Sequence, residues 1–279
     1  MSTLVETQDH DASVSPLVRF GQELRRSRRA MRWSQAELGR RMGYSDAMIS
    51  YIERAKKPVT SNFAIKADEV FQTGGTFLEL WRRYARASLL EGFAEFADAE
   101  ARCRRLRTFE LGVIPGLFQT EAYATALETA NIRRGSLTQE QADERVAFLM
   151  QRQRLLDQKA PPTIHAVLDQ SCLLRPIGGR AVMLNQLDHL ESLAAHPNIT
   201  IQVAPFELAE QRPFVLPLVL LTLPDRSVVG YAESQLRGYL ERGRPTIAGW
   251  EEDYDQLQVE SLSTAASLTM IRAVRKDLE

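Results

Sequence analysis

Two short segments of helical periodicity, separated by a tight turn, dominate the hydrophobic pattern near the N-terminus. In residues 35–42 and 46–53, apolar side chains recur three and four positions apart, which predicts two amphipathic helices. Ser34 followed by Glu37 is the pattern of a capping box at the start of the first helix. Gly43 stands where a helix ends in a left-handed conformation, and Ser45 can cap the second helix. The pattern therefore predicts a helix-turn-helix.

The second predicted helix has two different faces. Met48, Ile49 and Ile52 form an apolar inner stripe, and the opposite side is small or polar. An ordinary helical hairpin would show the same stripe. The turn length, Gly39 where two helices can cross closely and the surrounding positive charge favour DNA binding instead. The residues predicted to face the groove are Gln35, Ser45, Asp46, Ala47, Ser50, Tyr51 and Arg54, with Lys56 and Lys57 on phosphate.

The charge of the chain is divided unevenly. The 279 residues carry a net charge of -1, but residues 16–86 hold 15 Lys and Arg against 7 Asp and Glu. This part therefore carries +8 and the remainder -9. A basic front part joined to an acidic remainder is typical of a nucleic-acid module attached to a domain that does not bind nucleic acid.

The flanking pattern predicts the domain boundaries. Residues 1–15 are polar and predict a mobile arm, and residues 16–75 the DNA-binding domain. A helix at 17–31 carries several arginines, which either contact phosphates or form a solvated face. Thr60 or Ser61 can cap a closing helix. Residues 76–93 predict a linker helix, whose aromatic stripe fits packing better than a ligand cage.

The rest of the chain, residues 94–279, predicts a second domain of mixed α and β structure. Alternating or continuous apolar runs predict strands at 104–111, 164–168, 199–203, 214–223 and 227–234, the last two forming a hairpin. Helical patterns occur between and after them, one with a capping box at Thr138 and Gln141. The predicted fold class is mainly α with an α+β second domain, in which helices cover a mixed, largely antiparallel sheet.

Several classes of function lack their sequence signals. Cys103, Cys172 and four scattered histidines form no metal-binding pattern, and no cofactor motif is present. Ser171 or Cys172 with His165 or His189 is the one tempting catalytic set, but no nucleophile elbow surrounds it. Residues 175–180 either cradle an anion at a helix start or form a plain loop. We therefore expect no metal, no cofactor and no enzymatic activity.

Two resemblances extend this interpretation. Residues 24–71 resemble the helix-turn-helix domains of the Xre and phage-repressor class, through Ser34 with Gln35 and through Ile49, Ser50, Ile52 and Glu53. This resemblance implies a five-helix bundle, a Gln35 contact with a phosphate or an outer base, and a pairing of Glu53 with Arg28. VIPGLFQTEAYATAL, LDQSCLLRPIGG and HPNITIQVAPF are similar to segments of the actinobacterial WhiJ-like group. That similarity implies control of transcription and antitoxin-like pairing with a small protein encoded nearby.

The base code of the motif departs from the class it resembles. Several Xre-type domains place an amide side chain early in the second helix, where it can read adenine, whereas this chain has Asp46 and Ala47. A carboxylate can accept a hydrogen bond from cytosine but is repelled by phosphate.

Together these patterns predict a sequence-specific, DNA-binding transcription regulator. A homodimer would present two DNA-binding domains, here called heads, to half-sites about 34 Å apart on double-stranded DNA. The second domain would dimerise and either sense a small-molecule effector or hold a partner protein. The N-terminus lacks the features of a signal peptide and no long apolar run occurs, so we expect the protein in the cytoplasm, on the nucleoid.

Overall fold

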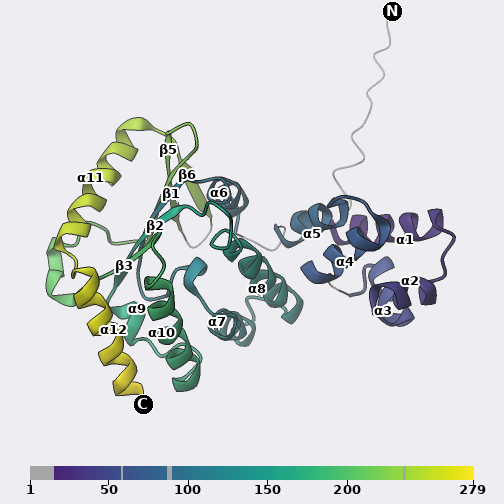
Figure 1. Ribbon diagram of the computed structural model, residues 1–279, viewed down its shortest axis with the longest axis horizontal. Coiled ribbons are helices and arrows are strands. Elements are labelled where there is room, and N and C mark those ends of the chain that lie inside the picture. Colours follow the sequence, from purple (N-terminus) through teal and green to yellow (C-terminus); the bar gives the residue numbers. More distant parts are fainter. Residues whose placement is uncertain (1–15, 58, 87–89, 235–236) are drawn as a thin grey trace, which may run out of the picture. The chain divides into compact units, whose positions relative to one another are not determined.

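The computed structural model describes residues 16–57, 59–86, 90–234 and 237–279, which divide into an N-terminal unit, Met1–Ser88, and a C-terminal unit, Leu89–Glu279 (Figure 1). The mobile arm predicted at residues 1–15 lies outside the described residues.

Five helices build the described part of the N-terminal unit, as the Xre resemblance implied. They are α1 (Pro16–Ala30), α2 (Gln35–Met42), α3 (Asp46–Glu53), α4 (Ser61–Phe71) and α5 (Thr76–Arg86). Their apolar stripes meet in one core, where Phe20 lies against Phe63 and Phe77 with ring centroids 6.2 and 5.5 Å apart. Burial of these stripes stabilises helices that are too short to persist alone in water.

The two-helix motif begins and ends where the sequence predicts. The Ser34 hydroxyl accepts the amide of Glu37 at 3.0 Å, Gly43 has a φ of 73°, and the Ser45 hydroxyl accepts the amide of Met48 at 3.2 Å. The capping box is only half formed, because the Glu37 carboxylate pairs with Arg40 and Arg41 instead of returning to Ser34. The two arginines stand three and four residues after Glu37, where side chains face one another on a helix.

The prediction of one linker helix at residues 76–93 is wrong. Its first part, α5, packs against α1 and α4, and the side chains of Phe77 and Trp81 are fully buried. The aromatic stripe therefore closes the N-terminal core, and the N-terminal unit extends beyond residue 75. A separate helix, α6 (Phe93–Glu100), begins the second unit.

A six-stranded sheet forms the centre of the C-terminal unit. Its strands are β1 (Arg105–Glu110), β2 (Thr163–Asp169), β3 (Ile199–Ala204), β4 (Leu218–Thr222), β5 (Val228–Glu233) and β6 (Gly238–Glu241), in the order β3-β2-β1-β4-β5-β6. The pairs β3–β2 and β2–β1 are parallel, and the other three pairs are antiparallel. The sheet is thus mixed, as predicted.

The sheet differs from the prediction in two places. Strand β6 was not predicted, because its four residues are too short for a period to be visible. Strand β4 is shorter than the apolar run at 214–223, and Val215 and Leu216 before it are 76% and 59% exposed. A continuous apolar run does not show where pairing starts.

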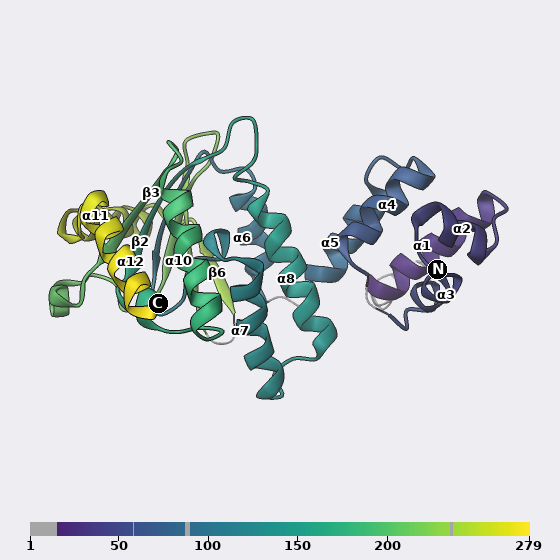
Figure 2. The same ribbon diagram turned by 60° about the horizontal axis from the view of Figure 1, so that its bottom comes forward.

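Helices cover both faces of the sheet (Figure 2). Besides α6 they are η1 (Gly116–Phe118), α7 (Glu121–Arg133), α8 (Gln139–Gln153), α9 (Ser171–Leu174), α10 (Arg180–Ala194), η2 (Phe206–Gln211), α11 (Arg244–Glu260) and α12 (Thr264–Leu278). The capping box of α8 is complete, with Thr138 and Gln141 bonded reciprocally as predicted.

The alternation of side chains along the strands separates two cores. Leu106 of β1, Ile164 of β2 and Tyr231 of β5 face the core that includes residues of α6, α10 and α12. Phe109 and Val167 point to the opposite face, where α11 covers them with Tyr254 and Leu257. Successive residues of a strand point to opposite faces, so β1 and β2 each contribute to both cores.

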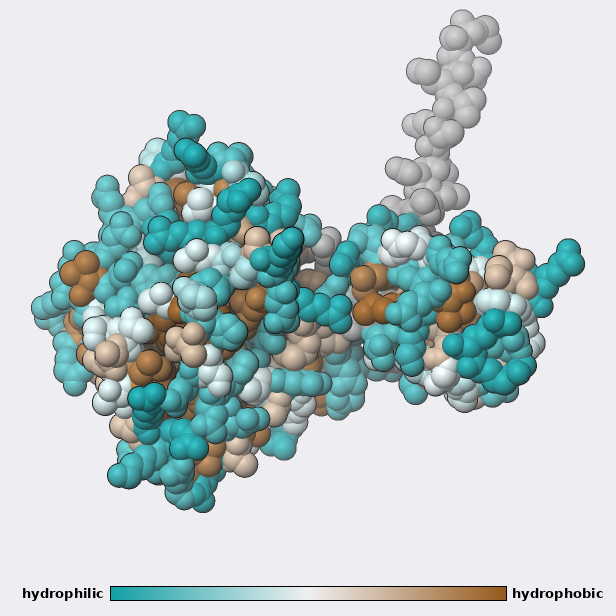
Figure 3. Space-filling view, in the orientation of Figure 1, coloured by the Kyte–Doolittle hydropathy of each residue, from teal (hydrophilic) through white to brown (hydrophobic). Residues whose placement is uncertain are grey.

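The surface gives no sign of a membrane segment among the described residues, none of whose helices is long and apolar enough to cross a bilayer. On the face shown in Figure 3, hydrophilic residues cover most of each unit and apolar residues occur in small patches.

Gly39 sets the distance between the two helices of the motif. A Cβ at this position would lie 2.6 Å from the carbonyl oxygen of Tyr44 in the turn. Gly39→Ala should therefore push α3 away from α2 and destabilise the N-terminal unit by about 1–3 kcal/mol. Hydrogen exchange measured by mass spectrometry across α2 and α3 will report this loss.

Gly249→Ala is the matched control, because Gly249 also lies within a helix but a Cβ there meets no atom within 4 Å. This change should protect α11 by up to about 1 kcal/mol through helix propensity alone. Unchanged exchange in α2 and α3 of the Gly39→Ala protein would contradict the close approach.

Candidate nucleic-acid interface and ligand cavity

Helix α3 presents the predicted outer face to solvent. Asp46, Ala47 and Arg54 are exposed, Tyr51 is 46% exposed, and Ser50 is half-buried. The inner residues Ile49 and Ile52 are fully buried, while Met48 is only half-buried. A short, exposed and largely polar helix face of this kind fits the major groove.

A buried ion pair fixes α3 from behind. Nε and Nη2 of Arg28 donate to the two carboxylate oxygens of Glu53 at 2.5 and 2.9 Å, and the two side chains are 11% and 2% exposed. Such a bidentate pair fixes direction as well as distance. The pairing implied by the resemblance is therefore confirmed. The hydrogen bond to Glu53 raises the pKa of Arg28 more than burial lowers it.

Gln35 belongs to the same network. Its amide nitrogen donates to Glu53 at 2.9 Å, so one of its two amide hydrogens is used inside the protein. The side chain is half-buried. Gln35 holds the start of α2 against the end of α3, and its contact with DNA stays a prediction.

The chain leaves α3 through a tight turn that exposes two lysines. Ala55 has a left-handed φ of 52°, and the amide of Lys56 donates to the carbonyl of Tyr51 at 2.8 Å. This is the hydrogen bond of a Schellman turn, with alanine where glycine is usual. Lys56 and Lys57 are exposed beside the end of α3, where phosphate contacts were predicted.

Two predicted groove residues are partly engaged by their own helix. The Asp46 carboxylate accepts the amide of Ala47 at 2.8 Å. Nε of Arg54 donates to the carbonyl of Ser50 at 3.1 Å, and its guanidinium lies 5.4 Å from the centre of the Tyr51 ring. Arg54 is therefore aligned along α3 beside Tyr51. Ser45 is exposed, with its hydroxyl used as the helix cap.

The C-terminal unit contains a second candidate site, a cavity of about 630 Å³. Its floor is the sheet, where Thr108, Val219 and Tyr231 lie side by side on β1, β4 and β5. Two residues further along their strands, Glu110 of β1 and Glu233 of β5 also line the cavity. Glu233 is exposed, so the cavity opens to solvent at the end of β5.

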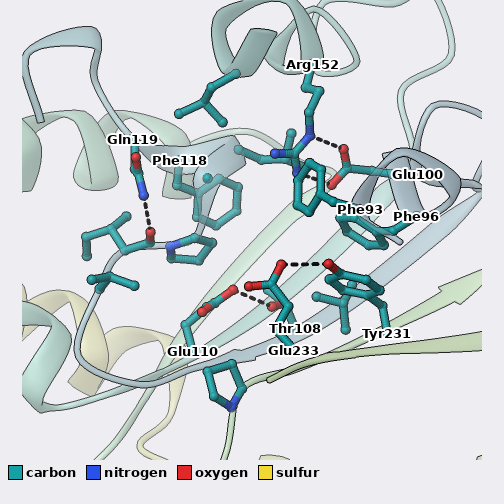
Figure 4. Close-up of a pocket in the computed structure, with 18 of the residues that line it drawn as sticks. Phe93, Phe96, Glu100, Thr108, Glu110, Phe118, Gln119, Arg152, Tyr231 and Glu233 are labelled. Carbon is teal, nitrogen blue, oxygen red and sulfur yellow. Dashed lines mark hydrogen bonds and ion pairs between the residues drawn. The ribbon is translucent and has the colours of Figure 1, made fainter. Parts of the chain in front are cut away.

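Helices α6, α7 and α8 and the loop around η1 form the opposite wall. Arg152 of α8 donates from Nε and Nη2 to Glu100 of α6 at 2.7 and 2.8 Å (Figure 4). Its guanidinium also lies 4.8 Å from the ring centre of Phe93. Since the side chains of Arg152 and Glu100 are 15% and 3% exposed, their mutual pairing offsets the cost of burying both charges.

Glu110 has an unusual electrostatic environment. Burial, followed by the negative charge of Glu233, raises the pKa of Glu110 to about 8, against a weak lowering by Thr108 and Arg152. Its side chain keeps some contact with solvent through the cavity. The Glu233 carboxylate accepts the hydroxyl of Tyr231 at 2.7 Å. Burial and this bond raise the pKa of Tyr231, which therefore keeps its proton.

The catalytic and anion alternatives find other partners. The Ser171 hydroxyl donates to Asp169, and the Cys172 thiol to the carbonyl of Glu110 at 3.4 Å. Burial raises the pKa of Cys172, and His165 bonds to Gln202 at 2.7 Å. Arg180, the first residue of α10, donates to the carbonyl of Leu278.

The cavity was missed by sequence reasoning. Thr108 with Glu110, and Tyr231 with Glu233, are polar or amphipathic residues two apart at the ends of apolar strands, which is a weak signal. Nothing local indicates that Phe93, Arg152 and Glu233 meet, because their convergence depends on tertiary packing.

The exposed second helix, its close turn and its buried support define a helix-turn-helix protein, and this motif indicates a DNA-binding regulator. Residues 19–91 match a family profile described as a helix-turn-helix domain. Residues 93–273 match the profile described as a domain of unknown function (DUF5753), and the chain belongs to that family. No curated protein and no solved structure matches the chain significantly.

The raised pKa of Glu110 predicts a pH-dependent stability. The folded carboxyl keeps its proton to about pH 8, whereas a free glutamate loses its proton near 4.5. The free energy of unfolding of the wild-type protein should therefore fall by at most about 1.4 kcal/mol per pH unit as the pH rises through this window. It should level off above the window. Glu110→Gln removes this loss, so its advantage over wild type should grow from pH 5 to pH 8 in urea unfolding.

Four other titratable groups lie around Glu110 and affect its charge or could titrate beside it. Glu233 raises and Arg152 lowers the pKa of Glu110 through their charges, and burial keeps Tyr123 and Cys172 neutral by raising the pKa of both. Glu252→Gln on the exposed side of α11 is the control and should show a pH-independent difference from wild type. A constant difference for Glu110→Gln would contradict the raised pKa.

Proposed function

We propose that the protein is a sequence-specific transcription regulator of the Xre type, in which α3 docks in the major groove of double-stranded DNA. The observation that carries this proposal is the exposed outer face of α3, held from behind by the buried pair of Arg28 and Glu53. A recognition helix has to be rigid, because base readout requires hydrogen bonds at fixed positions.

The charges around α3 support the same proposal. Lys56 and Lys57 follow the helix. Helix α1 carries exposed arginines at positions 25, 26 and 29, and exposed Arg32 follows its end. Cations in such places position a protein on the phosphate backbone, and the side chains of α3 then select the sequence. Asp46 near the start of α3 favours cytosine at its position, since a carboxylate accepts from the cytosine amino group.

The C-terminal unit would join two such heads and receive a signal. A homodimer doubles the interface and fits an operator with two half-sites about 34 Å apart. We propose that this unit binds and does not catalyse. The Cys172 thiol donates to a backbone carbonyl, His165 bonds to Gln202, and Ser171 bonds to Asp169 through both its amide and its hydroxyl, as in a local turn, with no histidine between them. The cytoplasm, on the nucleoid, is the compartment that fits this function.

A second candidate function is antitoxin-like, in which the C-terminal unit chiefly holds a small partner protein, as in the WhiJ-like group. Val215 and Leu216, 76% and 59% exposed, favour it, because adjacent exposed aliphatic side chains are typical of interaction surfaces. Native mass spectrometry of the protein purified from its own host separates the possibilities. A stoichiometric small protein supports the antitoxin-like function, and a homodimer without one supports the autonomous regulator.

Two substitutions test the docking of α3 once the bound sequence is selected from a random DNA pool. Arg54→Ala should relax base preference at one position, by about 1–3 kcal/mol of discrimination. Lys57→Ala should weaken all sequences alike and lower the slope of log affinity against log salt by about one. Both are measured by fluorescence anisotropy at several salt concentrations.

Arg83→Ala is the matched control, since Arg83 is an exposed cation of the same unit on α5, paired with Glu79 at 3.6 Å. It should leave both base preference and salt slope unchanged. The docking proposal fails if Arg54→Ala and Lys57→Ala bind every sequence as wild type does.

A further inference from the structure

The cavity of the C-terminal unit is built as a binding site for a small molecule. Its volume of about 630 Å³ lies within the range of about 300–1,000 Å³ that is usual for ligand pockets. Every lining residue belongs to the C-terminal unit, so the site is complete within that unit. Its lining residues also lie within the matched family region, apart from Leu90.

The wall of the cavity is largely apolar and aromatic. Tyr231 stacks on Phe96 with ring centroids 4.1 Å apart and an angle of 17°, and Phe93 stands edge-on to both (Figure 4). Phe118, Leu149 and other aliphatic residues continue this surface. An apolar body of ring size would bury its surface here without leaving polar groups of the wall unpaired.

The arginines of the cavity already have partners. Arg152 is bound by both oxygens of Glu100, and Arg145 lies 3.7 Å from Glu128. These two pairs are neutral overall. A carboxylate or phosphate ligand would have to displace a glutamate from a buried pair, which is costly.

Two carboxyl groups remain at the floor. Glu110 and Glu233 point toward the same space from neighbouring positions of the sheet (Figure 4). Within the part of the chain that the structure describes, neither carboxyl has an arginine, lysine or histidine at ion-pair distance. Pro217 also lines the cavity and, as a proline, has no backbone N–H to offer the carboxyl groups. A donor with positive charge fits this gap.

We propose that this cavity binds a small organic cation, with a protonated amine between Glu110 and Glu233 and an apolar, ring-sized body against Phe93, Phe96 and Tyr231. Charge-assisted bonds to two carboxyl groups would orient the amine, and the aromatic wall would accept the body. A metal ion fits less well, because the described residues contain no group of three His, Cys, Asp or Glu side chains placed to hold one.

The cavity reaches the beginning of the C-terminal unit. Leu90 and Phe93 line it, and both lie close in sequence to Leu89, where that unit begins. A ligand bound there would be the signal that the C-terminal unit receives. This signalling role depends on the proposed function, whereas binding of the cation does not.

Calorimetry of the full chain without DNA tests the site with three probes of one shape. These are 2-(1-naphthyl)ethylamine, its neutral analogue 2-(1-naphthyl)ethanol and the anion 1-naphthylacetate. The amine should bind about tenfold or more tightly than the alcohol, and the anion more weakly than both. Because Glu110 keeps its proton at neutral pH in the empty cavity, amine binding should also release a proton, seen as a heat that depends on the buffer.

Variants locate the site. Glu110→Gln with Glu233→Gln should reduce the affinity for the amine to that for the alcohol, and Glu252→Gln should change neither. Val146→Trp, which fills the cavity from α8, should abolish binding of both. Thermal unfolding of each variant shows that it is folded.

The proposal is overturned if the amine and the alcohol bind equally well, if the anion binds most tightly, or if the glutamine double variant keeps the preference for the amine. It is also overturned if the folded wild-type protein does not bind the amine at about 1 mM. None of these outcomes depends on whether the head binds DNA, so failure of the cation site is distinguishable from failure of the proposed function.

Discussion

Pairing of buried charge supports both candidate sites. Arg28 and Glu53 are joined by two hydrogen bonds behind α3, and Arg152 and Glu100 are joined in the same way at the wall of the cavity. Removing one partner of such a pair leaves an unpaired buried charge, at a cost of about 3–5 kcal/mol. In each unit the pair joins two helices: α1 and α3 in the N-terminal unit, and α6 and α8 in the C-terminal unit. The pairs thereby fix the exposed face of α3 and the wall of the cavity.

The two units use polar residues in opposite ways. In the N-terminal unit the apolar side chains turn inward and the cations turn outward, which suits contact with a large anion in water. In the C-terminal unit, two carboxyl groups lie at the floor of the cavity, and burial raises the pKa of one of them, Glu110. The charges of the two parts differ in the same sense: residues 16–86 carry +8, whereas residues 89–279 hold 20 Lys and Arg against 26 Asp and Glu, a charge of -6.

The cavity illustrates how a binding site is retained at some cost to stability. A protonated or unpaired carboxyl next to a second carboxyl weakens the empty fold at neutral pH. Groups that destabilise the empty protein and can be satisfied by a ligand are characteristic of functional sites.

Local signals determined the helix-turn-helix almost completely. The caps at Ser34 and Ser45, the left-handed Gly43 and the apolar spacing in α2 and α3 are short-range properties, and each is found where the sequence predicts it. The strands β1, β2, β3 and β5 and the capping box of α8 were predicted for the same reason. Their side chains report burial through a period of two or of about 3.6 residues.

Tertiary structure decided what local patterns could not. The aromatic stripe of α5 fits a linker as well as a core, and packing against α1 and α4 placed it in the core. The Glu37 carboxylate could accept from the backbone amide of Ser34 or pair with two arginines, and it pairs with Arg40 and Arg41. Glu110 and Glu233 are far apart in sequence and line one cavity because the order of strands brings β1 beside β4 and β4 beside β5. Arg152 reaches the same cavity from α8. Register and strand order are long-range choices, made by the whole core at once, so the sequence alone identified the DNA-binding head while the fold revealed the cavity.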